Sequence, residues 1–109
     1  MMRLSLDLDN KPYLIAENRA RWIAYWFNTE CKIYQTKNGY HVESDLIDTR
    51  YKITPERQLL IREHLGDDPR RIQLDKERIK KGWEWDVLFH SKNGTERQFI
   101  RKIKAGAYN

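Results

Sequence analysis

The sequence predicts an α+β fold: a two-layer sandwich with a mainly antiparallel sheet and helices packed on one of its faces. Three observations support this prediction. An alternating apolar run opens the chain, two Asn-Gly dipeptides stand between extended segments, and three further segments carry helical spacing or helix start signals. At 109 residues the chain suits one domain with a single core, so we expect residues 1–109 to form one domain.

The first extended run is predicted as a strand with one apolar face. Its residues alternate between Leu4, Leu6, Leu8 and Ser5, Asp7, Asp9. Because successive side chains of a strand point to opposite faces, we expect the leucines in the core and the two aspartates together on the other face. Residues 16–27 follow as a predicted helix, and its tryptophans Trp22 and Trp26 are expected to anchor the core.

The middle of the chain predicts a β-hairpin that carries a histidine. Residues 32–36 and 40–43 are extended runs, and the Asn-Gly pair between them favours a tight turn. If this hairpin neighbours the first strand, His41 shares the polar face with Asp7 and Asp9. The alternative is ordinary, because antiparallel sheets often have one solvated face with acidic residues or a lone histidine.

Two helices are predicted next, each with start and stop signals. Thr54, followed by proline and glutamate, is a helix cap, and Gly66 ends that helix. Asp68, again followed by proline, caps a second helix over residues 69–81, which Gly82 stops. Both helices follow the hairpin in sequence, as expected for an α+β order of elements.

The C-terminal third predicts a second hairpin and carries the excess of positive charge. Residues 85–91 and 97–103 are extended runs around a second Asn-Gly pair. Residues 70–104 hold eleven Lys or Arg against five Asp or Glu, whereas residues 1–69 hold ten against eleven. This excess indicates a polyanionic partner. The residues expected to contact nucleic acid are Arg97, Arg101, Lys102 and Lys104.

Composition disfavours several classes of protein. The single cysteine, Cys31, allows no disulfide framework and no cysteine-based zinc site. No apolar run approaches the roughly 20 residues of a membrane span and the start is no signal peptide, so we expect a soluble, cytoplasmic protein without a membrane partner. The five glycines are isolated and form neither a phosphate loop nor a nucleophile elbow. Charged residues make up 34% of the chain, which fits a thermophile.

Two motifs occur in a suggestive order. The first strand ends in Leu6-Asp7-Leu8-Asp9, and the hairpin contains Thr36-Lys37-Asn38-Gly39-Tyr40-His41. This order resembles the RRM-like palm of archaeo-eukaryotic primases and primase-polymerases. The resemblance implies that Asp7 and Asp9 coordinate Mg²⁺ or Mn²⁺ and that His41 contacts the phosphates of the incoming nucleotide, together with Thr36, which stands where the family usually has serine.

The family's third motif is an acid before a basic helix, followed by a turn that contacts triphosphate. Here Asp67 and Asp68 precede the helix that contains Arg78, and His90 and Lys92 lie at the last hairpin. Asp68 is better explained as a helix cap, so the resemblance implies Asp67 as the third catalytic carboxylate. It likewise implies that Arg78, His90 and Lys92 bind the nucleotide, although an ordinary exposed hairpin also accounts for the last two. The family acid normally ends an apolar strand, which neither aspartate does.

The resemblance implies a minimal primase-polymerase-like nucleotidyltransferase. Its expected partners are nucleoside triphosphates, single-stranded or primed DNA and a replication partner protein. The alternative is a non-catalytic nucleic-acid-binding module of the same fold, in which exposed Trp83, Trp85 or Tyr108 stack on bases, unless the two tryptophans close the core instead. A rolling-circle nickase is a third interpretation, but the His-hydrophobic-His pair that binds its metal is absent.

Overall fold

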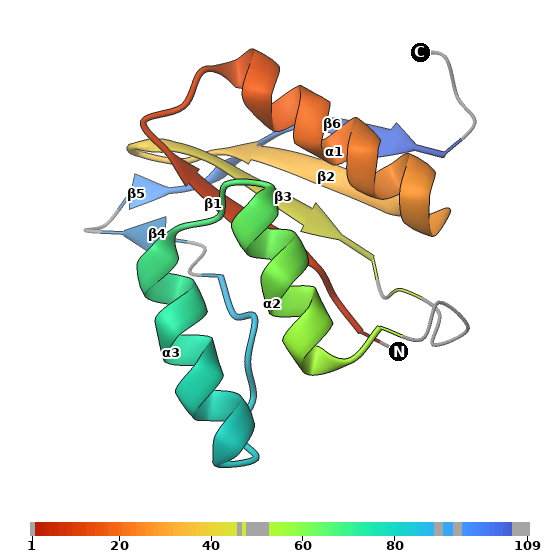
Figure 1. The fold of residues 1–109 in the computed structure, drawn as a ribbon. Coiled ribbons are helices and arrows are strands. Elements are labelled where there is room, and N and C mark those ends of the chain that lie inside the picture. Colours follow the sequence, from red (N-terminus) through yellow and green to blue (C-terminus); the bar gives the residue numbers. More distant parts are fainter. Residues whose placement is uncertain (1, 46, 48–52, 89–90, 93–94, 106–109) are drawn as a thin grey trace.

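A computed structural model describes residues 2–45, 47, 53–88, 91–92 and 95–105. Within these residues, four strands form one antiparallel sheet in the order β1-β3-β2-β6, and three helices pack against it (Figure 1). The predicted α+β sandwich is therefore confirmed. The strands are β1 (Ser5–Asp9), β2 (Glu30–Gln35), β3 (Gly39–Ser44) and β6 (Gln98–Lys104), the helices are α1 (Tyr13–Phe27), α2 (Pro55–His64) and α3 (Pro69–Lys80), and β4 (Ser91–Lys92) pairs separately with β5 (Thr95–Glu96).

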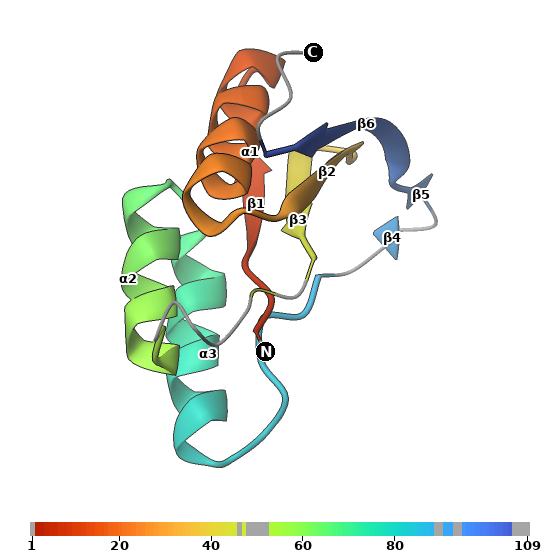
Figure 2. The same ribbon diagram turned by 90° about the vertical axis from the view of Figure 1, so that its right-hand side faces the viewer.

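The core lies between the sheet and its helices. The leucine face of β1 is fully buried, as the alternation predicted, and α1 covers the same face of β2, β3 and β6. Figure 2 shows the helices on one side of the sheet and the β4–β5 pair on the other. The buried apolar residues include Leu4, Leu6, Leu8, Ala16, Ala20, Ile23, Ile33, Val42, Leu65 and Ile103. None of the described helices is long and apolar enough to cross a bilayer.

The prediction that both tryptophans of α1 are core anchors is wrong for one of them. Trp22 packs against the core, but Trp26 lies one turn further along and is 58% exposed. The two rings contact each other, with centroids 5.2 Å apart. Helical spacing places residues i and i+4 on the same flank, but it does not show how far along the helix the sheet extends.

The predicted hairpin between β2 and β3 is confirmed, and its glycine has a packing role. Gly39 pairs with Asp9 of β1 across the sheet. A Cβ atom at this position would overlap the carbonyl oxygen of Leu8. Because only glycine allows so close an approach, the Gly-Tyr-His run has a structural reason that is independent of any ligand.

Both predicted helix starts are confirmed. The Thr54 side chain accepts a hydrogen bond from the backbone of Arg57, and the Asp68 side chain accepts one from the backbone of Arg70. Gly66 follows α2 with a φ of 90°, the left-handed conformation that ends many helices. Asp68 therefore fixes where α3 begins, directly beside β1.

The predicted strand over residues 85–91 is wrong for most of its length. Residues 85–88 form no strand, and Asp86 adopts a left-handed φ of 58°. Of the described residues in this region, the short β4 segment pairs with β5. The last long strand, β6, pairs with β2 instead. The carboxylate of Asp86 accounts for the difference, because it hydrogen bonds to β1 and holds this segment at the sheet edge.

Candidate metal site at the edge of the sheet

Asp7, Asp9 and His41 share the polar face of the sheet, as predicted. Asp7 on β1 is the direct antiparallel partner of His41 on β3, and Asp9 is two residues further along the same strand. The Nε2 atom of His41 lies 3.6 Å from Oδ1 of Asp7. The histidine is only 6% exposed, so it faces the aspartate from within the fold.

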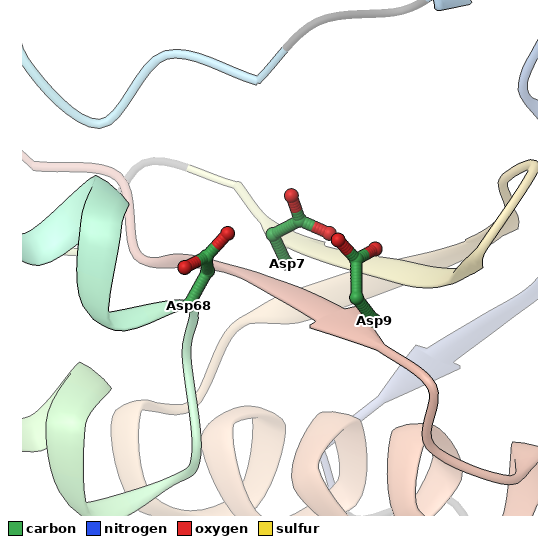
Figure 3. Close-up of side chains that lie close together, drawn as sticks. All are labelled: Asp7, Asp9 and Asp68. Carbon is green, nitrogen blue, oxygen red and sulfur yellow. The ribbon is translucent and has the colours of Figure 1, made fainter.

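Asp68 joins the two aspartates of β1 from the start of α3 (Figure 3). One carboxylate oxygen from each of Asp7, Asp9 and Asp68 lies within 4.8 Å of the others. Asp68 also caps α3 by accepting a hydrogen bond of 2.9 Å from the backbone of Arg70. We call Asp7, Asp9 and Asp68 together the carboxylate group. Asp68 belongs to this group and caps α3 at the same time, although the two roles were predicted as alternatives.

Asp67, predicted as the third carboxylate of this group, is engaged elsewhere, and the prediction is corrected in favour of Asp68. Its side chain is fully buried between α2 and α3, where Oδ2 accepts a hydrogen bond of 2.8 Å from Arg62. Its other oxygen, Oδ1, accepts backbone hydrogen bonds from Asp7 at 2.8 Å and from Asp68 at 2.9 Å. One buried oxygen therefore ties two members of the carboxylate group together.

The free edge of β1 is covered by side chains and not by another strand. The backbone N–H groups of Ser5 and Asp7 donate to Asp86 Oδ2 at 3.0 Å and to Asp67 Oδ1 at 2.8 Å. Arg71 bridges the two acceptors, with 2.8 Å ion pairs to both carboxylates. A sheet edge normally leaves such N–H groups unpaired. Here these two N–H groups are paired, and their hydrogen bonds hold the start of α3 and the segment around Asp86 against β1.

The Asp7 carboxyl resists ionisation. Burial, followed by the nearby charge and hydrogen bonding of Asp9, raises the pKa of Asp7 from 3.8 to about 7. Oδ1 of Asp7 is buried and has no hydrogen-bond donor among the described residues. Three carboxylates with one unsatisfied oxygen suit a hard divalent cation, because Mg²⁺ and Mn²⁺ prefer oxygen ligands and would offset the repulsion between the acids.

Arg70 is a further residue at this site that the sequence analysis did not single out. Its side chain is 83% exposed and donates to Asp68 Oδ2 at 3.3 Å. The hydrogen bond and charge of Asp68, with smaller contributions from Asp9 and Asp7, raise the pKa of Arg70. The signal was present in the sequence, because the residue two positions after a helix cap lies beside the capping side chain.

Of the other predicted nucleotide-binding residues, Thr36 and Arg78 have partners outside the three carboxylates. The Thr36 hydroxyl accepts a hydrogen bond from the backbone of Gly39, which stabilises the hairpin turn. Arg78 pairs with the buried Asp75 at 3.1 Å, and it lies about 15 Å along α3 from the cap. His90 lies outside the described residues, and the same holds for the side chain of Lys92.

The four basic residues predicted to contact nucleic acid differ in their surroundings. Arg97 is 8% exposed and pairs with Glu43 at 2.9 Å. Arg101 points to the helix side of the sheet, where it pairs with Glu17 of α1 at 2.6 Å. Lys102 and Lys104 are the exposed ones, on the polar face. Arg97 and Arg101 are thus held by acidic side chains of the fold, and the two lysines are the more exposed of the four.

Comparisons with models of protein families, with curated proteins and with solved structures found no match.

Proposed function

We propose that the protein is a divalent-metal-dependent nucleotidyltransferase that acts on nucleoside triphosphates and a DNA template. The observation that carries this proposal is the convergence of Asp7, Asp9 and Asp68 from two separate elements, each with an oxygen within 4.8 Å of the others. The fit to Mg²⁺ or Mn²⁺ rests on three oxygen donors and on the unsatisfied buried oxygen of Asp7. This arrangement supports the function that the resemblance to primase-polymerases implies.

The side chains around the carboxylates have distinct tasks under this proposal. Asp7, Asp9 and Asp68 would hold the cation, which would neutralise charge on the phosphates during transfer. Arg70 is exposed beside them and can donate to a phosphate oxygen. His41 is too buried to meet a phosphate readily, and its 3.6 Å approach to Asp7 favours a role in orienting that carboxylate.

The experiment measures Mn²⁺ binding by calorimetry, and product formation from labelled triphosphates on a primed DNA template. Asp9→Asn removes one ligand charge at a partly exposed position, so the variant is expected to fold, to bind Mn²⁺ more weakly and to form no product. Asp45→Asn is the matched control, because Asp45 is exposed and lies outside the carboxylate group. Equal Mn²⁺ affinity in wild type and in Asp9→Asn would refute the metal site.

The second candidate function is a non-catalytic nucleic-acid-binding module. The exposed lysines Lys102 and Lys104 on the polar face of β6 favour it. This function is supported if wild-type protein binds DNA but forms no product in Mn²⁺ or Mg²⁺, and if the double variant Asp7→Asn, Asp9→Asn binds DNA equally well. The enzyme proposal would then be rejected.

A further inference from the structure

One row of paired residues crosses the whole sheet on its polar face. Asp7 pairs with His41, His41 with Tyr34, and Tyr34 with Phe99, so that each strand contributes one residue. Neighbouring strands are about 4.8 Å apart, which makes the row about 14 Å long. It begins at the carboxylate group on β1 and ends at an aromatic ring on β6.

A β-bulge turns Phe99 onto this face. The register between β2 and β6 shifts at Ile33 and Tyr34, whose partners are Arg101 and Phe99. In a regular strand, Phe99 and Lys102 would point to opposite faces because they are three residues apart. The shift allows Arg101 to face α1 while the Phe99 ring packs edge-on against Tyr34, with centroids 5.7 Å apart.

The Phe99 ring is open to solvent, although its neighbours are held in place. Phe99 is 56% exposed. The guanidinium of Arg97 lies 3.7 Å from the centre of the Tyr34 ring, and the same side chain pairs with Glu43. Tyr34 is thus covered and fixed, and it supports Phe99 from the side. An exposed aromatic ring on a rigid sheet is the arrangement on which nucleic-acid bases stack.

Three lysines lie further along the same face, toward the end of β6 that pairs with Glu30. Lys32 on β2 lies opposite Lys102 on β6 and, on its other side, opposite Glu43 on β3, which pairs with Arg97. Lys102 and Lys104 share one carboxylate, Glu30, at 3.6 and 3.9 Å. Lys32 forms no ion pair within the part of the chain that the structure describes, so the group keeps an excess of positive charge.

We infer that Phe99 and the three lysines Lys32, Lys102 and Lys104 bind a single strand of nucleic acid, with one base stacked on the Phe99 ring and the lysines on its phosphates. The inference deepens the proposed function, since Phe99 and the carboxylate group stand at the two ends of one row on the same face of the sheet. The Phe99 ring and the lysines do not depend on a bound metal. An acidic protein segment would use the same lysines and gain little from the ring.

The test measures binding of labelled single-stranded oligonucleotides, dT and rU, by fluorescence anisotropy at several salt concentrations. Phe99→Ala is expected to weaken binding about 5- to 100-fold, because one stacked base is lost. Phe99→Trp should restore the affinity. Lys102→Gln with Lys104→Gln should lower the salt slope by about 2. Tyr25→Ala is the matched control, since Tyr25 is also an exposed aromatic residue but lies on α1, on the opposite side of the sheet.

Three results would overturn the inference. They are the absence of wild-type binding at low salt, binding of Phe99→Ala equal to that of wild type, and competition by an acidic peptide equal to that of the oligonucleotide. Mn²⁺ calorimetry on the same variants separates the two proposals. If Phe99→Ala binds Mn²⁺ normally and the oligonucleotide weakly, both proposals are supported. If oligonucleotide binding depends on Phe99 but the protein binds no Mn²⁺, the metal site is refuted and the nucleic-acid surface is retained. The dT and rU arms distinguish DNA from RNA.

Discussion

Replacing Asp7 by asparagine should stabilise the protein at neutral pH while it removes metal binding. Burial and the neighbouring Asp9 raise the pKa of Asp7 from 3.8 to about 7, so its ionised form opposes folding. A difference of about 3 pKa units corresponds to about 4 kcal/mol at most. The side chain is 21% exposed and solvent screens part of this energy, so we expect Asp7→Asn to gain about 1 to 3 kcal/mol at pH 8.

The sign of the pH dependence follows from the raised pKa. The unfolded chain releases the Asp7 proton near pH 3.8, whereas the folded protein keeps it up to about pH 7. Between these values the folded state binds more protons, so the free energy of unfolding of the wild type falls as pH rises. Asparagine does not titrate. Its advantage should therefore be absent below about pH 4, grow through pH 5 to 6 and be complete above pH 7.

Urea unfolding followed by tryptophan fluorescence, at pH 4, 6 and 8 in the presence of a chelator, measures this difference. Asp45→Asn, at an exposed position, should change stability by less than about 0.5 kcal/mol at each pH. Mn²⁺ at a hundred times its Kd should stabilise the wild type by about 2.7 kcal/mol and leave Asp7→Asn unchanged. An Asp7→Asn variant that is less stable than wild type at pH 8, or whose advantage is the same at pH 4, would refute the reasoning.

Three further variants test how the carboxylate group is held. Asp67→Asn and Asp86→Asn remove equally buried partners of Arg71, so both should destabilise the fold, but only Asp67 bonds to the backbone of two carboxylate-group residues. Calorimetry should therefore show Mn²⁺ affinity falling about 10- to 100-fold for Asp67→Asn and staying near wild type for Asp86→Asn, and equal losses would contradict a positioning role. Gly39→Ala should cost about 1 to 3 kcal/mol in urea unfolding and weaken Mn²⁺ binding, because β1 must move away from β3; unchanged stability would show that the hairpin adapts instead.

The sequence was sufficient where a local rule determines the structure. Alternation in β1 placed the leucines in the core and Asp7 on the polar face with His41, because the period of a strand is two. The caps at Thr54 and Asp68 started α2 and α3 where predicted, since a side-chain oxygen followed by proline satisfies the first turn of a helix.

The sequence was insufficient where the outcome depends on contacts between distant residues. The cap rule identified Asp68 at the start of α3, but it did not show that Asp68 also lies beside Asp7 and Asp9, or that Asp67 turns inward to Arg62 and Arg71. The hydrogen bond from Ser5 to Asp86, which holds the segment before β4 at the edge of β1, likewise joins residues 81 positions apart. The hydrophobic periodicity of a sequence predicts strands and helices, but it does not indicate which distant residues form pairs.

The buried charges around Asp67 explain how mutually repelling carboxylates can stay close together. Ion pairs buried in a protein interior contribute little to stability after desolvation, so the network of Arg62, Arg71 and Asp67 is poorly explained as a stabilising device alone. Its hydrogen bonds instead fix the backbone at Asp7 and Asp68, where relaxation would otherwise separate the acids. The network of Arg62, Arg71 and Asp67 therefore keeps the acids close together, although their proximity makes the ionisation of Asp7 unfavourable. A bound cation would neutralise this negative charge.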